Sequence, residues 1–192
     1  MRRVLLASSS PYRRELLSRL QLPFDFAAPD IDETAKPNER AEQLVRRLAM
    51  EKAQALAKAY PEHLIIGSDQ VAVLGERIIG KPKDFERARQ QLLDSSGKSI
   101  TFLTGLALLD SRDASVQVDC VPFTVHFREL DEARIGRYLN IEQPYHCAGS
   151  FKAEGLGISL FRATEGEDVT SLIGLPLIRL VDMLLAKGVE VP

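Results

Sequence analysis

A lysine on the apolar face of a predicted helix is the first residue here that could do chemistry. Residues 38–60 have the spacing of an amphipathic helix, with apolar residues three and four positions apart. The apolar stripe contains Ala41, Leu44, Val45, Leu48, Ala49, Leu56 and Tyr60. Lys52 falls near the centre of that stripe. Because a buried ammonium needs a partner, Lys52 either faces an anion, pairs with a carboxylate of the protein, or extends its amine to solvent.

Serines and arginines at a strand-to-helix turn indicate a second position for an anion. The predicted strand Val4–Ala7 is followed by Ser8-Ser9-Ser10-Pro11, in which an N-cap serine precedes a proline suited to the first helical position. The helix, predicted over 11–21, offers free N–H groups and the positive end of its dipole. Arg13 and Arg14 lie in its first turn, where a bound anion would offset their charge. The alternative is an ordinary serine cap with solvated arginines.

Carboxylates follow two of the predicted strands. Asp69 comes directly after the apolar strand 63–68, as a candidate general base or metal ligand, or as the start of an Asx turn. Asp30, Asp32 and Glu33 belong to the acidic loop 29–38. Together with Asp69 they could hold a magnesium ion if the fold brings them together.

Two further lysines lie in loops that contain glycine. They are Lys81 in Gly80-Lys81-Pro82 and Lys152 in Gly149-Ser150-Phe151-Lys152. Each could be a surface lysine. Taken together, several cationic positions, hydroxyl donors and scattered carboxylates in one chain of net charge −2 suggest a polyphosphate substrate with a metal. The sequence has no G-x-x-x-x-G-K-[ST] motif, so it is not a P-loop protein.

The elements that must position these residues indicate a mixed α/β fold. Further strands are predicted over 24–28, 71–74, 100–109, 116–127 and 155–162, and further helices over 84–94, 131–140 and 175–187. The long strands 100–109 and 116–127 are joined by a short turn and differ from a doubly wound repeat. We expect one domain over residues 1–192, with an elongated mixed sheet, long antiparallel strands, and helices in two lobes around a central cleft.

Composition excludes several classes of protein. The chain has 192 residues, enough for a core without disulfides, and its charge balance lacks the basic excess of a general nucleic-acid binder. No apolar run approaches the ~18 residues of a membrane span. The two cysteines, Cys120 and Cys147, form no C-x-x-C motif and fit a reducing compartment. We therefore expect a cytoplasmic protein that acts on a small molecule, without nucleic-acid or membrane partners.

Several motifs, in order along nearly the whole chain, resemble the signature of the Maf family. They are Ala7-Ser8-Ser9-Ser10-Pro11-Tyr12-Arg13-Arg14-Glu15-Leu16-Leu17, Asp32-Glu33-Thr34, Glu51-Lys52-Ala53, Gly67-Ser68-Asp69-Gln70-Val71, Gly80-Lys81-Pro82, Ala148-Gly149 and Gly174-Leu175-Pro176. The resemblance implies a fold similar to inosine-triphosphate pyrophosphatases. It also implies hydrolysis of a nucleoside triphosphate to a monophosphate and pyrophosphate with a divalent metal, magnesium or manganese, and is compatible with a homodimer.

The resemblance also implies roles for individual residues. It makes Asp69 the expected catalytic proton acceptor, and Asp69 and Glu33 the candidates for metal ligands. The candidates for contact with phosphate are Ser8, Ser10, Arg13, Lys52, Lys81 and Lys152. Tyr12, Gln70 and Glu154 match positions that select the base.

Within the family, the segments 67–71 and 148–155 are similar to the 7-methyl-GTP pyrophosphatase branch. The dTTP- and UTP-cleaving branch carries Thr at the position of Gln70 and Gln at that of Glu154. The methyl-GTP branch has Trp at the position of Tyr12. The tyrosine keeps an aromatic face for stacking, but that face is smaller than that of tryptophan. N7-methylation makes guanine cationic, which suits a carboxylate and an aromatic face. The alternatives are a dTTP/UTP pyrophosphatase and a non-catalytic nucleotide-binding regulator of cell division.

Overall fold

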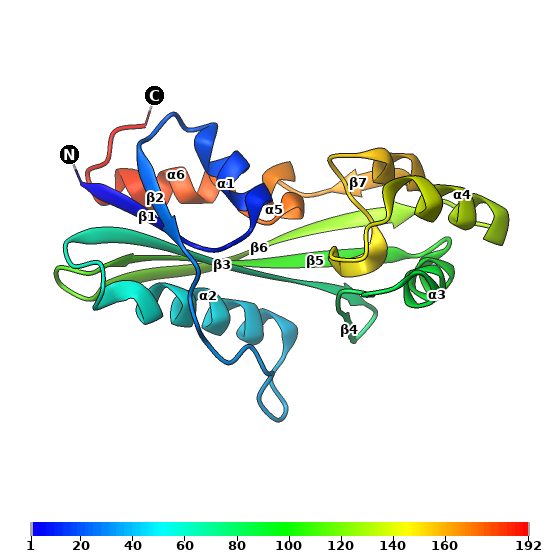
Figure 1. The fold of residues 1–192 in the computed structure, drawn as a ribbon, viewed down its shortest axis with the longest axis horizontal. Coiled ribbons are helices and arrows are strands. Elements are labelled where there is room, and N and C mark those ends of the chain that lie inside the picture. The colour runs from blue at the N-terminus through cyan, green and yellow to red at the C-terminus, as the bar shows by residue number, and fades with distance from the viewer. Residues whose placement is uncertain (1, 192) are drawn as a thin grey trace. The chain divides into compact units, whose positions relative to one another are not determined.

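The computed structural model describes residues 2–191, which form a mixed α/β fold (Figure 1). The strands are β1 (Arg3–Ala7), β2 (Phe24–Ala27), β3 (His63–Leu74), β4 (Arg77–Ile79), β5 (Ser99–Asp110), β6 (Ser115–Phe127) and β7 (Phe161–Glu165). The helices are α1 (Pro11–Ser18), α2 (Ala41–Ala57), α3 (Phe85–Ser95), α4 (Glu132–Glu142), α5 (Val169–Ile173) and α6 (Leu177–Leu185), with short 3-10 helices η1 (Ala148–Ser150) and η2 (Leu156–Leu160).

The seven strands form one sheet that mixes parallel and antiparallel pairs. Its order is β2-β1-β3-β5-β6-β7, and β4 pairs with β3 outside this path. β1 is parallel to β2 and to β3, whereas β4 is antiparallel to β3 and β7 is antiparallel to β6. The predicted mixed α/β class with long strands is confirmed.

The chain divides into two compact units. The first contains the residues up to Gln70, Leu103–Val121, and the residues from Asp168 onward, and the second contains Val71–Phe102 and Pro122–Glu167. Strands β3, β5 and β6 run through both units. The single domain with a central cleft between two lobes stays a prediction.

The core of the first unit follows from the alternation of side chains along its strands. Val4 and Leu6 of β1 face one side of the sheet, where they pack with leucines of α1 and α6. Leu5 and Ala7 face the other side, where Ala53 of α2 covers them. Figure 1 shows α1 and α6 on one face of the sheet and α2 on the other. Each face is therefore covered by helices, and nearly every residue of β1 is apolar.

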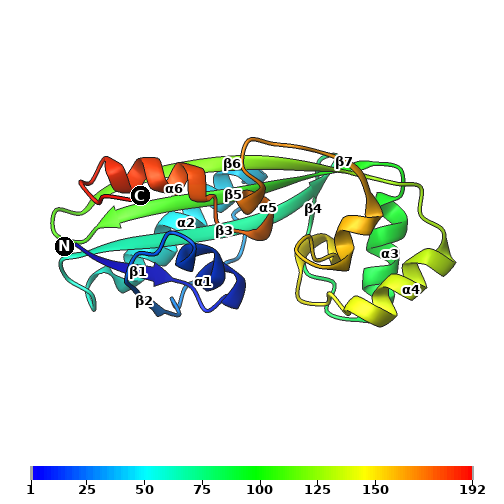
Figure 2. The same ribbon diagram turned by 90° about the horizontal axis from the view of Figure 1, so that it is seen from above.

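The core of the second unit is an aromatic cluster. The rings of Phe102, Phe127, Phe151 and Phe161 meet edge to face, with centroids 4.8–5.6 Å apart. Helices α3 and α4 of this unit lie side by side (Figure 2). Because Phe151 belongs to this cluster, the core anchors the segment in which Lys152 lies.

Several boundaries differ from the sequence-based expectations. The residues predicted as two strands, 63–68 and 71–74, form the single strand β3, so Asp69 lies within a strand and not after one. Helix α2 begins after Arg40 rather than after Asn38, because Asn38 has a φ of 60°, in the left-handed region. The prediction of a strand over 155–162 is wrong. That segment forms η2, and β7 begins only at Phe161.

The longest helix, α2, has 17 residues and carries several charges along its length. Within residues 2–191, no helix combines the length and the apolar character needed to cross a bilayer.

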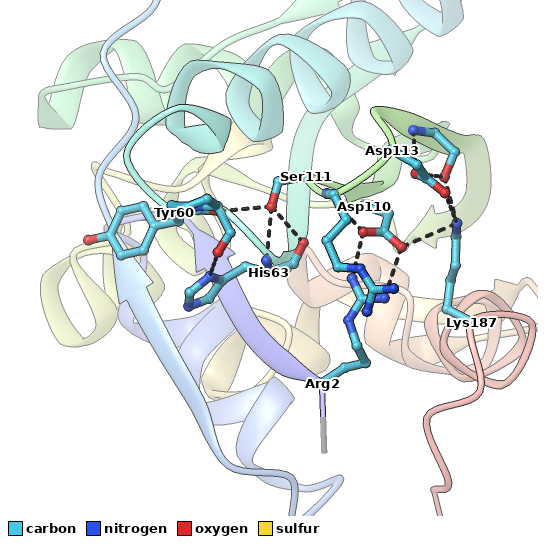
Figure 3. A network of polar contacts seen from close by, with 10 residues as sticks. Arg2, Tyr60, His63, Asp110, Ser111, Asp113 and Lys187 are labelled. Atoms are coloured by element: carbon cyan, nitrogen blue, oxygen red, sulfur yellow. Dashed lines mark hydrogen bonds and ion pairs between the residues drawn. The ribbon is translucent and has the colours of Figure 1, made fainter.

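A partly buried polar network joins the start of β1 to the turn between β5 and β6 (Figure 3). The guanidinium of Arg2 donates two hydrogen bonds to Asp110, from Nη1 to Oδ2 at 3.0 Å and from Nη2 to Oδ1 at 2.5 Å. Lys187, just after α6, lies 3.5 Å from the same carboxylate. The Ser111 hydroxyl donates to the Tyr60 carbonyl at 2.8 Å and accepts from the His63 N–H at 2.8 Å. The turn is thus tied to three other elements.

This network predicts how stability depends on pH. The hydrogen bonds from Arg2 lower the pKa of Asp110 to about 2, although burial opposes that shift. Because this pKa lies below its unfolded value of about 3.9, the pair stabilises the fold fully above that value and loses its effect as pH falls toward 2. We expect Asp110→Asn to lower the free energy of unfolding at pH 7 by about 2 kcal/mol or more. Between pH 4 and pH 2, urea titrations should then show a flatter pH dependence than in the unsubstituted protein. Equal slopes would contradict this account.

Candidate functional site

The centre of the candidate site is a buried lysine between two carboxylates. Lys52 Nζ lies 2.6 Å from Asp69 Oδ1 and 2.8 Å from Glu33 Oε1. The Lys52 side chain is 8% exposed and that of Asp69 is 11% exposed, whereas Glu33 is 60% exposed. Of the three alternatives for Lys52, the structure shows pairing with carboxylates of the protein. Both of those carboxylates are the metal-ligand candidates of the sequence analysis.

The Lys52–Asp69 ion pair forms because helix α2 lies unusually close to strand β3. A Cβ on Gly67 of β3 would lie 1.9 Å from the carbonyl oxygen of Ala49 in α2, so only glycine fits there. Asp69 follows Gly67 by two residues on the same face of the strand, and Lys52 follows Ala49 by three on the same face of the helix. β1 ends at Ala7, opposite Gly67, while β3 continues. Asp69 therefore lies just past the carboxyl end of a parallel neighbour, the usual place for ligand sites in such sheets.

Arg47 of α2 fixes the loop that carries Glu33. Its guanidinium binds both oxygens of Glu39, at 2.6 and 2.8 Å, and donates to the Thr34 carbonyl at 3.1 Å. It also lies 2.9 Å from Glu51 in the same helix. Hydrogen bonds with Arg47 lower the pKa of Glu39 to about 2. The residue next to Glu33 is thus fastened to the helix that carries Lys52.

The start of α1 brings serines and Arg13 to the same unit. The Ser10 hydroxyl accepts from the Arg13 N–H at 3.4 Å and caps the helix, as predicted, while the Ser8 hydroxyl accepts from the Ser10 N–H at 3.1 Å. A hydroxyl that accepts one hydrogen bond keeps its own proton to donate. Tyr12, in the same turn, is half-buried. The guanidinium of Arg14 stacks on the ring of Phe26, 4.3 Å from its centroid.

Arg13 is held by a carbonyl of the segment before α6. Its Nε donates to the Gly174 carbonyl at 2.8 Å, and the Ser68 hydroxyl donates to the same oxygen at 2.9 Å. Burial lowers the pKa of the Arg13 guanidinium, and the charges of Asp69 and Glu33 act in the opposite direction. Arg13 therefore belongs to the group around Lys52.

The amide of Gln70 is oriented by three acceptors. Its Nε2 donates to the carbonyls of Ser171 and Leu172, at 2.8 and 3.0 Å, and to the Thr104 hydroxyl at 3.0 Å. Thr104 in turn donates to the Ser171 carbonyl at 2.9 Å. Since two of the acceptors are carbonyls, the nitrogen must face α5, and the amide oxygen faces away from it.

The carboxylates of Asp69 and Glu33 fit a divalent metal that takes its remaining ligands from substrate and water. Within residues 2–191, no three His, Cys, Asp or Glu side chains form a group able to hold a metal ion. Asp69 and Glu33, however, already converge on one positive charge, the Lys52 ammonium. Magnesium is commonly held by one or two carboxylates, with substrate phosphates and waters as the other ligands. The two carboxylates match that pattern.

The second unit groups the remaining candidates near the end of α4. Lys152 Nζ lies 3.5 Å from Glu142 Oε1, and Glu142 Oε2 accepts from the Leu156 N–H at 2.7 Å. The Tyr138 hydroxyl accepts from the Lys152 N–H at 3.1 Å. A Cβ on Gly155 would lie 2.8 Å from Glu142 Oε2, so glycine allows this approach. Two side chains of α4 thus hold the segment 152–156.

Charges around Cys147 show which other residues belong to this group. Burial raises the pKa of the Cys147 thiol to about 11; among the charges that act on it, Glu154 raises the value, and Lys152 and Lys81 lower it. Lys81 and Glu154 are exposed. Seven of the predicted site residues therefore fall into two groups, one in each unit. Arg13, Glu33, Lys52 and Asp69 form the group of the first unit; Lys81, Lys152 and Glu154 form that of the second.

The sequence analysis missed the residues that position these groups. They are Arg47, Thr104, Tyr138 and Glu142; Gly174 lies in one of the motifs quoted above, which gave it no role of its own. Only Glu142 carried a signal: an anionic side chain at a helix C-terminus is unfavourable toward the dipole and needs another reason to be there.

We predict that Glu142→Ala loosens the segment 152–156 without destabilising the fold. The substitution removes the acceptor of the Leu156 N–H and the charge facing Lys152, and it also removes a carboxylate from the negative end of α4. In hydrogen-exchange mass spectrometry, amides of this segment should exchange about fivefold to tenfold faster, with little change in melting temperature. Glu132→Ala, at the exposed start of the same helix, is the matched control. Unchanged protection in Glu142→Ala would refute the positioning role.

Solved structures offer a partial likeness. The Ham1 protein of Staphylococcus aureus has a TM-score of 0.48 and 16% identity, and the match covers 66% of this chain and 72% of that one. A HAM1 protein from Coxiella burnetii has a TM-score of 0.46 and 18% identity, covering 66% and 73%.

Comparisons of sequence reach much further. A family model described as Maf-like protein matches residues 3–187. A protein of Pseudomonas fluorescens strain Pf-5 is 74% identical over 189 residues, covering 98% of each chain, and one of Pseudomonas aeruginosa is 70% identical over the same length and coverage. A protein of Pseudomonas putida strain KT2440 is 66% identical, again over 98% of each chain. All three are named 7-methyl-GTP pyrophosphatase. The chain therefore belongs to the Maf family.

Proposed function

We propose that the protein hydrolyses 7-methyl-GTP to the nucleoside monophosphate and pyrophosphate and so removes a modified nucleotide from the pool. The observation that carries this proposal is the buried Lys52 between Asp69 and Glu33, with Arg13 beside them. A triphosphate carries about four negative charges, and a site for it needs cations that neighbouring groups hold in place. The names of the close relatives support the same substrate.

In the proposed reaction, a water molecule attacks the α-phosphorus and gives its proton to the Asp69 carboxylate. A bond forms between the water oxygen and phosphorus. The bond from the α-phosphorus to the oxygen bridging it to the β-phosphate breaks, and pyrophosphate leaves with the electron pair. Arg13 and Lys52 stabilise the negative charge that develops on the phosphate oxygens, and Ser8 and Ser10 donate hydrogen bonds.

Asp69 and Glu33 would hold the divalent metal, magnesium or manganese, which supplies further positive charge to the phosphates. Lys81 and Lys152 are further cations that we assign to the phosphates. A cytoplasmic location, action without nucleic-acid or membrane partners, and assembly as a homodimer are parts of the same proposal.

Recognition of the base is assigned to Tyr12, Gln70 and Glu154. The amide nitrogen of Gln70 is fully engaged by α5 and Thr104, so the residue offers its oxygen, which accepts hydrogen bonds from a base. Glu154 is an exposed carboxylate that attracts the positive charge of 7-methylguanine, and Tyr12 offers an aromatic face for cation–π contact.

The first test is release of pyrophosphate from a panel of nucleotides with Mg²⁺ or Mn²⁺. The panel contains 7-methyl-GTP, GTP, dTTP, UTP, CTP and ITP. We expect preferential cleavage of 7-methyl-GTP, and we expect Asp69→Asn to lose about 10²-fold to 10⁴-fold in kcat because the proton acceptor is gone. Thermal unfolding verifies that the variant is folded. A preference for dTTP or UTP would overturn the assigned substrate, and an active Asp69→Asn would overturn the assigned base.

The second test addresses the charge of the base. Glu154→Gln keeps the shape of the side chain and removes its charge. The ratio of kcat/KM for 7-methyl-GTP over GTP should fall about fivefold, as expected for an exposed ion pair worth ~1 kcal/mol. Glu165→Gln, another exposed glutamate of the same unit, is the control. An unchanged ratio in Glu154→Gln would exclude this residue from selection of the methylated base.

A further inference from the structure

The Lys52 ammonium occupies the point where the two carboxylates of the candidate metal site converge. Its nitrogen lies within 2.8 Å of an oxygen of each. Together with Arg13, the group has two positive and two negative formal charges, so it is neutral as it stands. A divalent cation that binds Asp69 and Glu33 must displace this ammonium or share their oxygens with it.

We propose that Lys52 competes with the divalent metal in the free protein, so that the metal binds tightly only together with the polyphosphate. This inference rests on the proposed function. In the free protein, Lys52 neutralises Asp69 and Glu33. When metal and nucleotide arrive together, the carboxylates turn to the metal and the ammonium turns to phosphate oxygens.

Electrostatics favour the coupled exchange over binding of the metal alone. A divalent ion added by itself raises the charge of the group from zero to +2, beside two cations that are largely removed from water. A polyphosphate brings the negative charge that offsets this excess. By linkage, each ligand then raises the affinity for the other by the same factor.

The packing of α2 limits how Lys52 can respond. The Ala49 carbonyl lies against the backbone of Gly67, so the helix is seated on β3. The flexible stem of the lysine can swing its amine while Cα stays in place. The exchange therefore needs a change of side-chain torsions and no movement of the helix.

The experiment measures Mn²⁺ binding, from the electron paramagnetic resonance signal of free Mn²⁺, in three proteins: the unsubstituted one, Lys52→Met and Lys58→Met. Lys58 is an exposed lysine at the end of the same helix and serves as the matched control. Without nucleotide, we expect Lys52→Met to bind Mn²⁺ about tenfold more tightly than the other two. With α,β-methylene-GTP present, affinity should rise about tenfold or more in the unsubstituted protein and clearly less in Lys52→Met. Equal or weaker Mn²⁺ binding by Lys52→Met would overturn the inference.

A measurement on the unsubstituted protein decides the matter if Lys52→Met fails to fold. Nitrogen-15 spectra of lysine ammonium groups should show a slowly exchanging Lys52 signal. That signal should persist in Mg²⁺ alone and shift only when Mg²⁺ and the analogue are both present. Loss of the signal in Mg²⁺ alone would refute competition.

Failure of the proposed function has a different signature. In that case the protein neither cleaves the nucleotide panel nor binds the analogue, while the comparison of Mn²⁺ affinities without nucleotide still decides whether Lys52 competes.

Discussion

The buried ion pair between Lys52 and Asp69 is the interaction on which the rest of the first unit's site depends. A lysine removed from water needs negative charge, and an aspartate in the middle of a strand needs positive charge. The two charges neutralise each other, with Lys52 Nζ donating a hydrogen bond to Asp69 Oδ1 at 2.6 Å. Glu33 joins the pair from a loop that Arg47 holds to α2, and Arg13 joins it from α1 through the Gly174 carbonyl. Helix α1 and the loop of Glu33, which are far apart in sequence from β3, thus both converge on the Lys52–Asp69 ion pair.

The second unit follows the same principle with other residues. Lys152 is paired with Glu142, as Lys52 is paired with Asp69. Two of the lysines assigned to phosphate are therefore neutralised by carboxylates of their own unit. This arrangement explains how a chain of net charge −2 can present cations to an anionic substrate without an overall basic surface. If these lysines bind phosphate as proposed, each must first exchange its carboxylate partner for a phosphate oxygen.

Sequence patterns predicted the fold class and the reactive side chains better than they predicted the residues and strand boundaries that position those side chains. Lys52 stood out because a charge in an apolar stripe needs a partner, and Ser10 because serine before proline caps helices. The continuity of β3 through Asp69 escaped prediction, since a polar pair inside an apolar run resembles a turn. The strand expected over 155–162 did not form: the Leu156 N–H is bound by Glu142, the Gly157 backbone packs against that of Lys152, and residues 156–160 form a 3-10 helix. Thr104 contacts Gln70 and the Ser171 carbonyl, which lie 34 and 67 residues away in the sequence, and local sequence patterns do not show such contacts.

Helix α2 rests on the sheet at two places where a side chain is absent. A Cβ at Gly67 would meet the Ala49 carbonyl at 1.9 Å, and one at Gly105 of β5 would meet the Val45 carbonyl at 2.1 Å. These carbonyls lie four residues apart, about one turn of the helix. The two glycines set the height of α2 above two neighbouring strands, and with it the reach of Lys52 toward Asp69. A single methyl group added at either position would lift the helix and lengthen an ion pair it does not touch. The site is therefore vulnerable at residues that bear no reactive atom.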